Sequence, residues 1–187
     1  MVDKEKIKKA TRLLLEAIGD DPNREGLLET PKRVAEMYAK ILNGFDEKPE
    51  KHLKVFKAES HDMVIVKDIP FYSYCEHHLV PFFGRIHVGY ITNEKMIGLS
   101  KIVRMLRVFA KRPQVQERLT KQIADALTSV LSEDVIVYVE AEHMCMSMRG
   151  VRAPGTTTVT AAVRGKFLNP PENKNPKEEF LFAIGKK

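Results

Sequence analysis

Two cysteines and one histidine place the strongest constraint on how this chain can fold. Cys75 and His78 are separated by two residues, and the only other cysteine, Cys145, lies far along the sequence. If the fold brings them together, two thiolates and one imidazole surround one point, a donor set that zinc favours in tetrahedral sites. Three protein ligands leave the fourth position open for water. His77 and His143 would lie beside such a site without being needed as ligands.

The same pair of cysteines is also compatible with two roles that involve no metal. Both could be small buried hydrophobic residues, which is a common role for free cysteine. They could also form a disulfide, although the sequence shows no signal-peptide pattern, and a thiol pair in the cytoplasm more often binds metal or takes part in catalysis. The Cys-x-x-His spacing by itself does not choose between these roles.

Size and charge narrow the classes of function. A length of 187 residues is typical of one domain, here with an N-terminal helical extension. The net charge of +6 and the pI of about 9.2 suit an anionic ligand. Eight Lys or Arg residues fall between Lys95 and Lys121, against the single carboxylate of Glu117, although such a run is also typical of a solvated helix face. No segment is long and apolar enough to cross a membrane, so we expect a cytoplasmic protein.

Helical periodicity dominates the N-terminal third of the chain. Apolar residues at helical spacing predict a helix over 3–19 and a second one from Thr30 to Phe45, with Thr30 as its N-cap. Arg33 lies in the first turn of the second helix, where a cation is unfavourable unless it is solvated or binds an anion. We expect residues 1–60 to form a helical region and connector, and residues 61–187 to form the catalytic domain.

The rest of the chain predicts an α+β domain. Pro113 is expected to open the second of two central helices, and the first spans about 100–111. The predicted order is ββααββ, giving a four-stranded antiparallel sheet with two helices covering one face. Its two open edges predict an oligomer formed by strand pairing between copies. The predicted strands are 63–69 (ended by Pro70), 85–91, 135–141 and 156–164.

Several separate motifs, in the same order, resemble GTP cyclohydrolase I. They are Cys75-Glu76-His77-His78 together with residues 26–34, 97–101, 112–120 and 143–150. The resemblance implies a tunnelling fold (T-fold), a toroidal homodecamer and active sites between subunits. It also implies a zinc-dependent hydrolase that converts GTP and water into formate and 7,8-dihydroneopterin triphosphate. This reaction is the first step of tetrahydrofolate and other pterin biosynthesis.

The resemblance also assigns roles to individual residues. It makes Cys75, His78 and Cys145 the Zn²⁺ ligands, and it makes His143 the general acid that protonates N7 of guanine. A histidine suits that role because it titrates near neutral pH. His77 is expected to assist the later proton transfers. These steps would follow attack of water on C8, the carbon between N7 and N9.

Substrate contacts follow from the same resemblance. Glu117 would accept hydrogen bonds from N1–H and the 2-amino group of guanine, with Gln116 adding a contact to the base. Without the resemblance, the preferred interpretation of Glu117 is a carboxylate that favours the N-terminus of a helix. Clustered cations and a hydroxyl suit a triphosphate. The residues expected to bind it are Ser100, Lys101, Arg104, Arg149 and, from another subunit, Arg33.

Two rival functions remain open from the sequence. A small zinc-stabilised nucleic-acid-binding protein fits the charge, but no aromatic residues alternate with the basic run as single-strand stacking requires, so we expect no nucleic-acid partner. Another pterin- or purine-handling enzyme of the same fold is a closer rival. There Cys75 would act as a nucleophile instead of a metal ligand.

Overall fold

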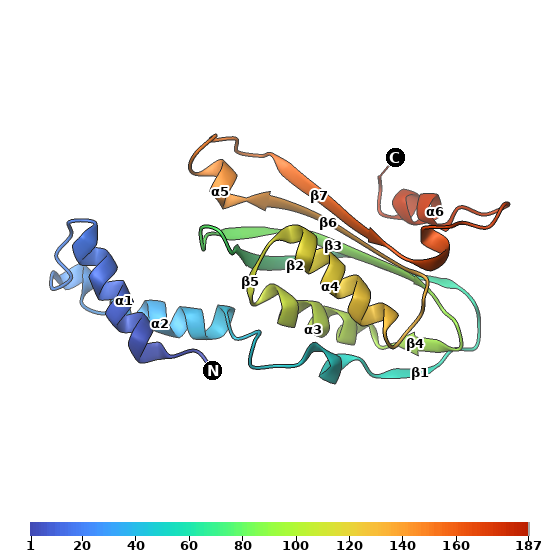
Figure 1. Cartoon of the computed structure of the whole chain (residues 1–187), viewed down its shortest axis with the longest axis horizontal. Coiled ribbons are helices and arrows are strands. Elements are labelled where there is room, and N and C mark those ends of the chain that lie inside the picture. The colour runs from blue at the N-terminus through green and yellow to red at the C-terminus, as the bar shows by residue number, and fades with distance from the viewer. Residues whose placement is uncertain (187) are drawn as a thin grey trace.

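A computed structural model describes residues 1–186, and these form helices packed on a curled, mixed β-sheet (Figure 1). The α+β class expected from the sequence is therefore confirmed. The helices are α1 (Lys4–Ala17), α2 (Thr30–Ile41), α3 (Leu99–Ala110), α4 (Gln116–Thr128), α5 (Met144–Ser147) and α6 (Pro176–Ala183). The strands are β1 (Val55–Lys57), β2 (Met63–Cys75), β3 (Pro81–Ile91), β4 (Lys95–Ile97), β5 (Pro113–Gln114), β6 (Val135–His143) and β7 (Thr157–Val163).

The main sheet of the described chain has the strand order β5-β2-β3-β6-β7. Its four long strands pair antiparallel, in agreement with the four-stranded antiparallel sheet expected from the predicted order of elements. The short strand β5 was not predicted, and it pairs parallel with the end of β2, which makes the sheet mixed. The register places Phe82 opposite His143, so the start of β3 lies beside the end of β6.

Helices α3 and α4 cover one face of this sheet and bury the main core between them (Figure 1). Helix α3 packs against β2, and α4 packs against β6 and β7. Side chains at helical spacing, such as Ile102, Leu106, Leu119 and Ile123, are fully buried there. Burial of such side chains contributes roughly 1.5–3 kcal/mol each, so this interface anchors both helices.

The opposite face of the sheet carries a smaller core under α6. Phe180 of α6 packs with Phe167 and Ile136. Gly89 of β3 allows this contact, because a Cβ there would lie 2.6 Å from the Phe180 ring. The side chain of Asn175 caps α6 by accepting a hydrogen bond from the Glu178 amide.

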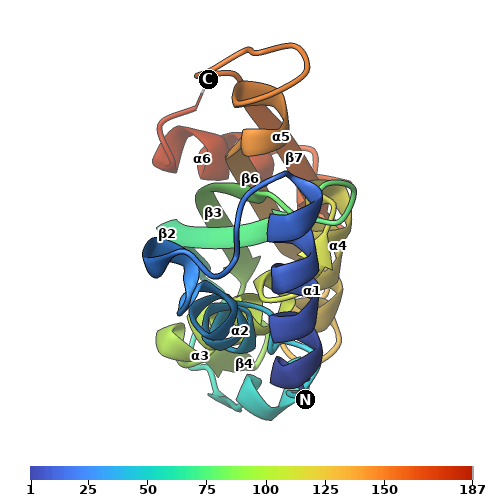
Figure 2. The same cartoon turned by 90° about the vertical axis from the view of Figure 1, so that its left-hand side faces the viewer.

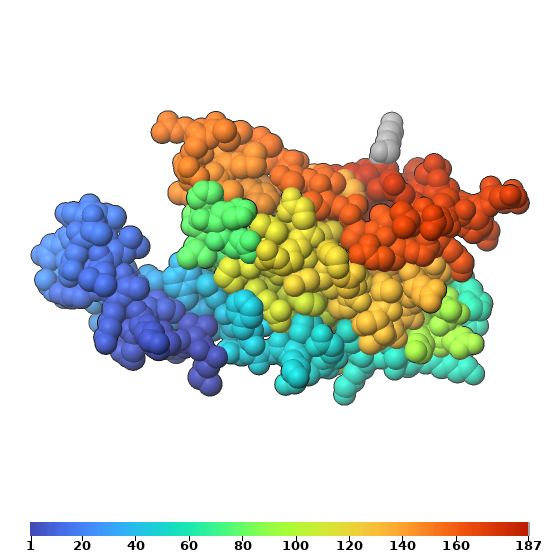
Figure 3. Space-filling model, in the orientation of Figure 1, coloured from blue at the N-terminus to red at the C-terminus, as the bar shows by residue number. Residues whose placement is uncertain are grey.

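The N-terminal helices α1 and α2 pack against each other and project from the rest of the molecule (Figures 1 and 3). Figure 2, turned so that this end faces the viewer, shows them in front of the sheet. Helix α2 begins at Thr30 and has Glu29 as its N-cap, so the predicted capping role of Thr30 is wrong by one residue. The helix ends at Ile41, and Phe45 beyond it lies exposed against Arg112.

Strand β2 is longer than the sequence predicts, because Pro70 does not end it. Strand β5 pairs with β2 only at Tyr74 and Cys75, so within the described chain the edge beside Pro70 is open. A proline is tolerated at such an edge, since no ladder hydrogen bond is lost. A bulge between Val66 and Ile69, with Asp68 at φ 58°, absorbs the local irregularity.

Two further predictions are corrected by the structure. Pro113 does not open a helix but begins β5, and α4 starts three residues later at Gln116. The connector expected at the end of residues 1–60 contains a short helical turn, Pro49–His52, and strand β1, which pairs with β4. Strand β1 has only three residues, which is too short for an alternation of apolar and polar side chains to be recognised in the sequence. No helix in the part of the chain that the structure describes is long and apolar enough to cross a membrane.

Candidate metal centre and active site

A tight hairpin between β2 and β3 carries two of the three possible metal ligands, one thiol and one imidazole. Cys75 is the last residue of β2 and is buried, whereas His78 lies exposed in the turn. The main chain closes the turn through hydrogen bonds from the Leu79 amide to the Cys75 carbonyl (2.8 Å) and from the Cys75 amide to the Val80 carbonyl (2.9 Å). Leu79 takes a φ of 54°, which reverses the chain between the strands.

The third donor arrives through the pairing of β3 with β6. Cys145 lies in α5, directly after β6, and the donor atoms of Cys75, His78 and Cys145 all lie within 4.8 Å of one another. Burial raises the pKa of the Cys145 thiol, and the neighbouring Cys75 raises it further. Two thiols held this close, with an imidazole beside them, form a donor set that could hold a metal ion. The predicted cluster is therefore present in the fold.

Glu142 stabilises the segment that carries Cys145. Its Oε1 accepts hydrogen bonds from the Ser147 hydroxyl (2.6 Å) and from the Gly155 amide (3.3 Å). These bonds lower the pKa of Glu142, with the Ser147 contact as the larger cause. The carboxylate thus joins the end of α5 to the end of the following loop.

His143, the last residue of β6, is fixed on two sides. Its ring stacks on Phe82 with centroids 4.6 Å apart and planes 2° from parallel. Its Nε2 lies 2.8 Å from Oε1 of Gln116, at the start of α4. Burial lowers the pKa of His143, whereas the charge of nearby Glu117 partly opposes this. The arrangement gives a partly buried imidazole of defined orientation two residues from Cys145.

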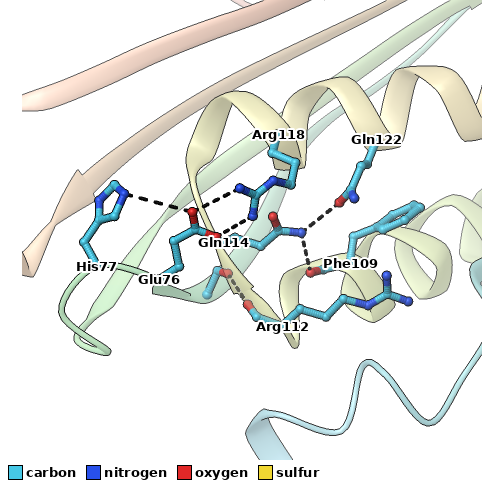
Figure 4. A network of polar contacts seen from close by, with 8 residues as sticks. Glu76, His77, Phe109, Arg112, Gln114, Arg118 and Gln122 are labelled. Atoms are coloured by element: carbon cyan, nitrogen blue, oxygen red, sulfur yellow. Dashed lines mark hydrogen bonds and ion pairs between the residues drawn. The ribbon is translucent and has the colours of Figure 1, made fainter.

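An ion pair ties the metal-site hairpin to α4 (Figure 4). Glu76 binds the Arg118 guanidinium through both carboxylate oxygens, one contact being 3.0 Å long. This pair lowers the pKa of Glu76. His77 lies 4.0 Å from the same carboxylate, and its side chain is 65% exposed. The ion pair therefore holds the turn against the helix that carries Gln116 and Glu117.

Hydrogen bonds of Gln114 also connect the hairpin to α3 and α4 (Figure 4). The Gln114 amide donates to the Phe109 carbonyl (3.1 Å) and to the Gln122 side chain (2.8 Å). The main-chain carbonyl of Gln114 accepts a hydrogen bond from the main-chain amide of Glu76 at 3.0 Å. The hairpin and the helices are thus connected by hydrogen bonds as well as by the ion pair.

Arg149 is the one predicted phosphate-binding residue that lies at the metal centre of this chain, within the residues that the structure describes. Its Nη1 lies 2.7 Å from Nε2 of His78. Glu117 is exposed on the first turn of α4, where it lines a hollow with Thr160 and Arg164 of the β7 region, and its charge acts on His143. A cation therefore lies at the cluster of thiols and imidazole, and a carboxylate lies near His143.

The remaining predicted phosphate ligands lie elsewhere in the chain. Ser100, Lys101 and Arg104 lie in the first half of α3, whereas the far end of α3 leads into β5 beside Cys75. A helix of 12 residues is about 18 Å long, so these residues do not meet the metal centre within one chain. Arg33 lies exposed on α2, in the projecting pair.

Sequence reasoning missed several residues that hold the site in place. Phe82 and Glu142 gave no periodic or motif signal of their own, and Arg118 lies within the motif 112–120 but was assigned no role there, because the partners of these residues lie on other elements. Strand pairing of β3 with β6 brings Phe82 to His143, and this pairing is visible only in the fold.

Comparison with known proteins agrees with these observations. The profile of GTP cyclohydrolase I matches residues 7–184. "GTP cyclohydrolase 1" of Desulforamulus reducens is 61% identical and aligns over the whole of both chains. "GTP cyclohydrolase 1" of Clostridium perfringens (strain 13) is 56% identical over 94% of this chain and 96% of its own.

Among solved structures, the apo form of "archaeosine synthase QueF-Like" aligns with a TM-score of 0.45 and 15% identity, over 57% of this chain and 97% of its own. That similarity is too low to support an inference. The profile match covers most of the chain and the relatives align along nearly their full lengths. The chain therefore belongs to the GTP cyclohydrolase I family.

Proposed function

We propose that this protein hydrolyses GTP at C8 of guanine, releasing formate and forming 7,8-dihydroneopterin triphosphate for tetrahydrofolate and pterin biosynthesis. The observation that carries the proposal is the cluster of Cys75, His78 and Cys145, with His143 held beside it. The relatives named GTP cyclohydrolase 1 support the same reaction.

The metal centre has a defined place in this proposal. Cys75, His78 and Cys145 would hold Zn²⁺, and the ion would supply a Lewis acid that lowers the pKa of water. The donor set fits zinc because thiolates and imidazole are its preferred ligands. The rival role of Cys75 as a nucleophile is disfavoured, since His78 and Cys145 lie within ligand distance of it.

The histidines would move protons. His143 would protonate N7 while water adds to C8, and its partly buried ring is held at a fixed orientation for that transfer. His77 is exposed in the hairpin and would serve the later transfers during ring opening and formate loss.

Recognition of guanine would fall to Glu117, whose carboxylate can accept from N1–H and the 2-amino group together. Its exposed position above the hollow beside β7 supports that role. Gln116 was predicted to contact the base as well, and its side chain here is buried and bonded to protein atoms.

The triphosphate would bind between copies of the chain. Arg149 approaches the metal centre from its own chain. The distance between the start of α3 and that centre supports an active site that a second copy completes with Ser100, Lys101 and Arg104. Arg33 would come from another subunit. The toroidal homodecamer, the T-fold, the division at residue 60 and the cytoplasmic location remain parts of the proposal.

The decisive experiment measures formate release from GTP labelled at C8, before and after removal of metal by a chelator. We expect release to stop without metal and to return with zinc. No release from metal-loaded, assembled protein would contradict the proposed function. Salt-sensitive RNA or DNA binding without GTP turnover would instead favour the nucleic-acid-binding alternative.

A further inference from the structure

The side chain of Gln116 is oriented by its hydrogen-bond partners. It is 1% exposed, and its Nε2 lies 3.1 Å from the Val139 carbonyl and 2.9 Å from the Thr158 carbonyl. Main-chain carbonyls only accept hydrogen bonds, so the amide nitrogen must face β6 and β7. The amide oxygen then faces His143, at 2.8 Å from its Nε2. The opposite amide orientation would set oxygen against two carbonyl oxygens.

Two threonines agree with this orientation. The Thr120 hydroxyl donates to the Gln116 main-chain carbonyl at 2.7 Å, which uses its only proton. In the 2.6 Å contact between Thr120 and Thr160, the donor must therefore be Thr160. The Thr160 oxygen can then accept from Nε2 of Gln116, 3.1 Å away, so the two protons of Nε2 have three acceptors within reach. The donor and the acceptor of each contact in this buried network are thus determined.

The consequence falls on His143. An amide oxygen cannot donate, so the Nε2 of His143 must carry the proton in their shared hydrogen bond. The ring of Phe82 stacks on the imidazole with the two planes 2° from parallel, and this contact favours the observed orientation of the imidazole plane. We propose that Gln116 is a positioning residue that holds His143 as the Nε2–H tautomer, leaving Nδ1 as the nitrogen that exchanges protons with the substrate. This inference rests on the proposed catalytic role of His143.

The tautomer determines how the proton would travel. In charged His143 both ring nitrogens carry protons, and the Nδ1–H bond breaks as the N7–H bond of guanine forms, with the electron pair left on Nδ1. The Nε2–H stays bonded to Gln116 before and after the transfer, so the ring does not reorient. A neutral amide also accepts this bond without adding negative charge that would hold the proton on the ring.

The tautomer can be observed directly by ¹⁵N NMR of zinc-loaded protein labelled at histidine. The chain has six histidines, and the His143 signals are identified by their absence in His143→Asn. We expect neutral His143 to carry its proton on Nε2. We expect Gln116→Met to lose this preference, because the variant removes the acceptor that faces Nε2 of His143. A proton on Nδ1 in the wild type would overturn the inference, even if no variant folds.

Steady-state kinetics with GTP test the functional part. We expect Gln116→Met to lower kcat by about tenfold to a hundredfold, as loss of a histidine's outer partner does in other sites, with KM unchanged. Gln114→Met is the control, because it removes another buried amide that does not contact His143. It should lower stability while the His143 signals stay as in the wild type.

Two other results would contradict the inference in distinguishable ways. A raised KM with unchanged kcat would show that Gln116 contacts the base and does not act through His143. An altered tautomer with unchanged kcat would remove His143 from proton transfer, while formate release from C8-labelled GTP would still support GTP hydrolysis.

Discussion

At the scale of single residues, Gln116 and Glu117 show how neighbouring side chains take different tasks. Successive residues on a helix do not face the same way. Gln116 is buried and bonded to His143, whereas Glu117 is exposed where a ligand can reach it. The helix start therefore separates a residue that positions the imidazole from one that is available to the base.

Glu117→Gln tests the role of the exposed member of this pair. Loss of charge-assisted hydrogen bonds to guanine should lower kcat/KM for GTP by about tenfold to a hundredfold. Zinc content should stay unchanged, because Glu117 is not in the donor cluster. Kinetics together with metal analysis provide the measurement. Near-normal kcat/KM with a small loss of stability would indicate that Glu117 only favours the helix N-terminus.

His87 makes stability depend on pH. Burial lowers its pKa, with Asp68 opposing, and its Nδ1 accepts a hydrogen bond from the Asp68 amide at 3.2 Å. Below the unfolded value of 6.5 the unfolded chain takes up more protons than the folded one, so stability falls as the pH falls. His87→Gln keeps an acceptor but does not titrate. Urea unfolding should therefore show a weaker loss between neutral pH and about pH 5 in this variant, and an equal loss would contradict the assignment.

At the scale of secondary-structure elements, the site depends on two strand ends and one helix start. The end of β2, the end of β6 and the start of α4 converge on Cys75, His143 and Gln116. The Glu76–Arg118 pair joins the hairpin to α4 across an exposed surface. Exposed pairs contribute little to global stability, so its effect should be local.

Arg118→Met should therefore weaken metal binding more than folding. The freed hairpin would hold His78 less firmly, and metal affinity should fall by about tenfold, as with other losses of outer-shell support. Lys121→Met is the matched control, because its ion pair with Asp125 lies on the same helix away from the hairpin. Chelator competition measures the affinity. Equal affinities in the two variants would show that the pair does not support the site.

At the scale of the whole molecule, one copy of the chain does not bring all the predicted substrate-binding residues together at one place. The metal centre lies at one end of α3, and Ser100 and Lys101 lie at the other. The proposed active site shared between copies would resolve this separation. The open edges of β2 and β7 in the described chain are consistent with pairing between copies.

Mixing two inactive variants tests the shared site. Lys101→Ala removes a phosphate contact and Cys145→Ser removes a metal ligand, so each variant alone should be inactive or nearly so. Copies refolded together should regain a fraction of wild-type formate release, because some sites combine intact parts from both chains. Refolding of each variant separately is the control. No recovery in mixed assemblies of normal size would indicate that one chain supplies both contacts.

Periodicity and local motifs predicted much of this architecture. A high content of Val, Ile and Thr predicted β6 and β7, helical spacing predicted α1 and α3, and the Cys75-x-x-His78 spacing with Cys145 predicted the donor cluster. These predictions succeeded because the buried face of a helix or strand is visible along its own sequence. The predictions were wrong at Pro70, which lies inside β2, and at Pro113, which begins β5. At both positions the pairing with a neighbouring strand determines the structure around the proline.

The sequence by itself determined which donors, carboxylates and cations the protein has, and which elements carry them. Only the tertiary structure decided that Phe82 stacks on His143 and that Gln116 turns its oxygen toward that ring. It also decided that the start of α3 lies away from the metal centre. The physical reason is that these relations are contacts between elements far apart in the chain, so no local pattern of residues encodes them.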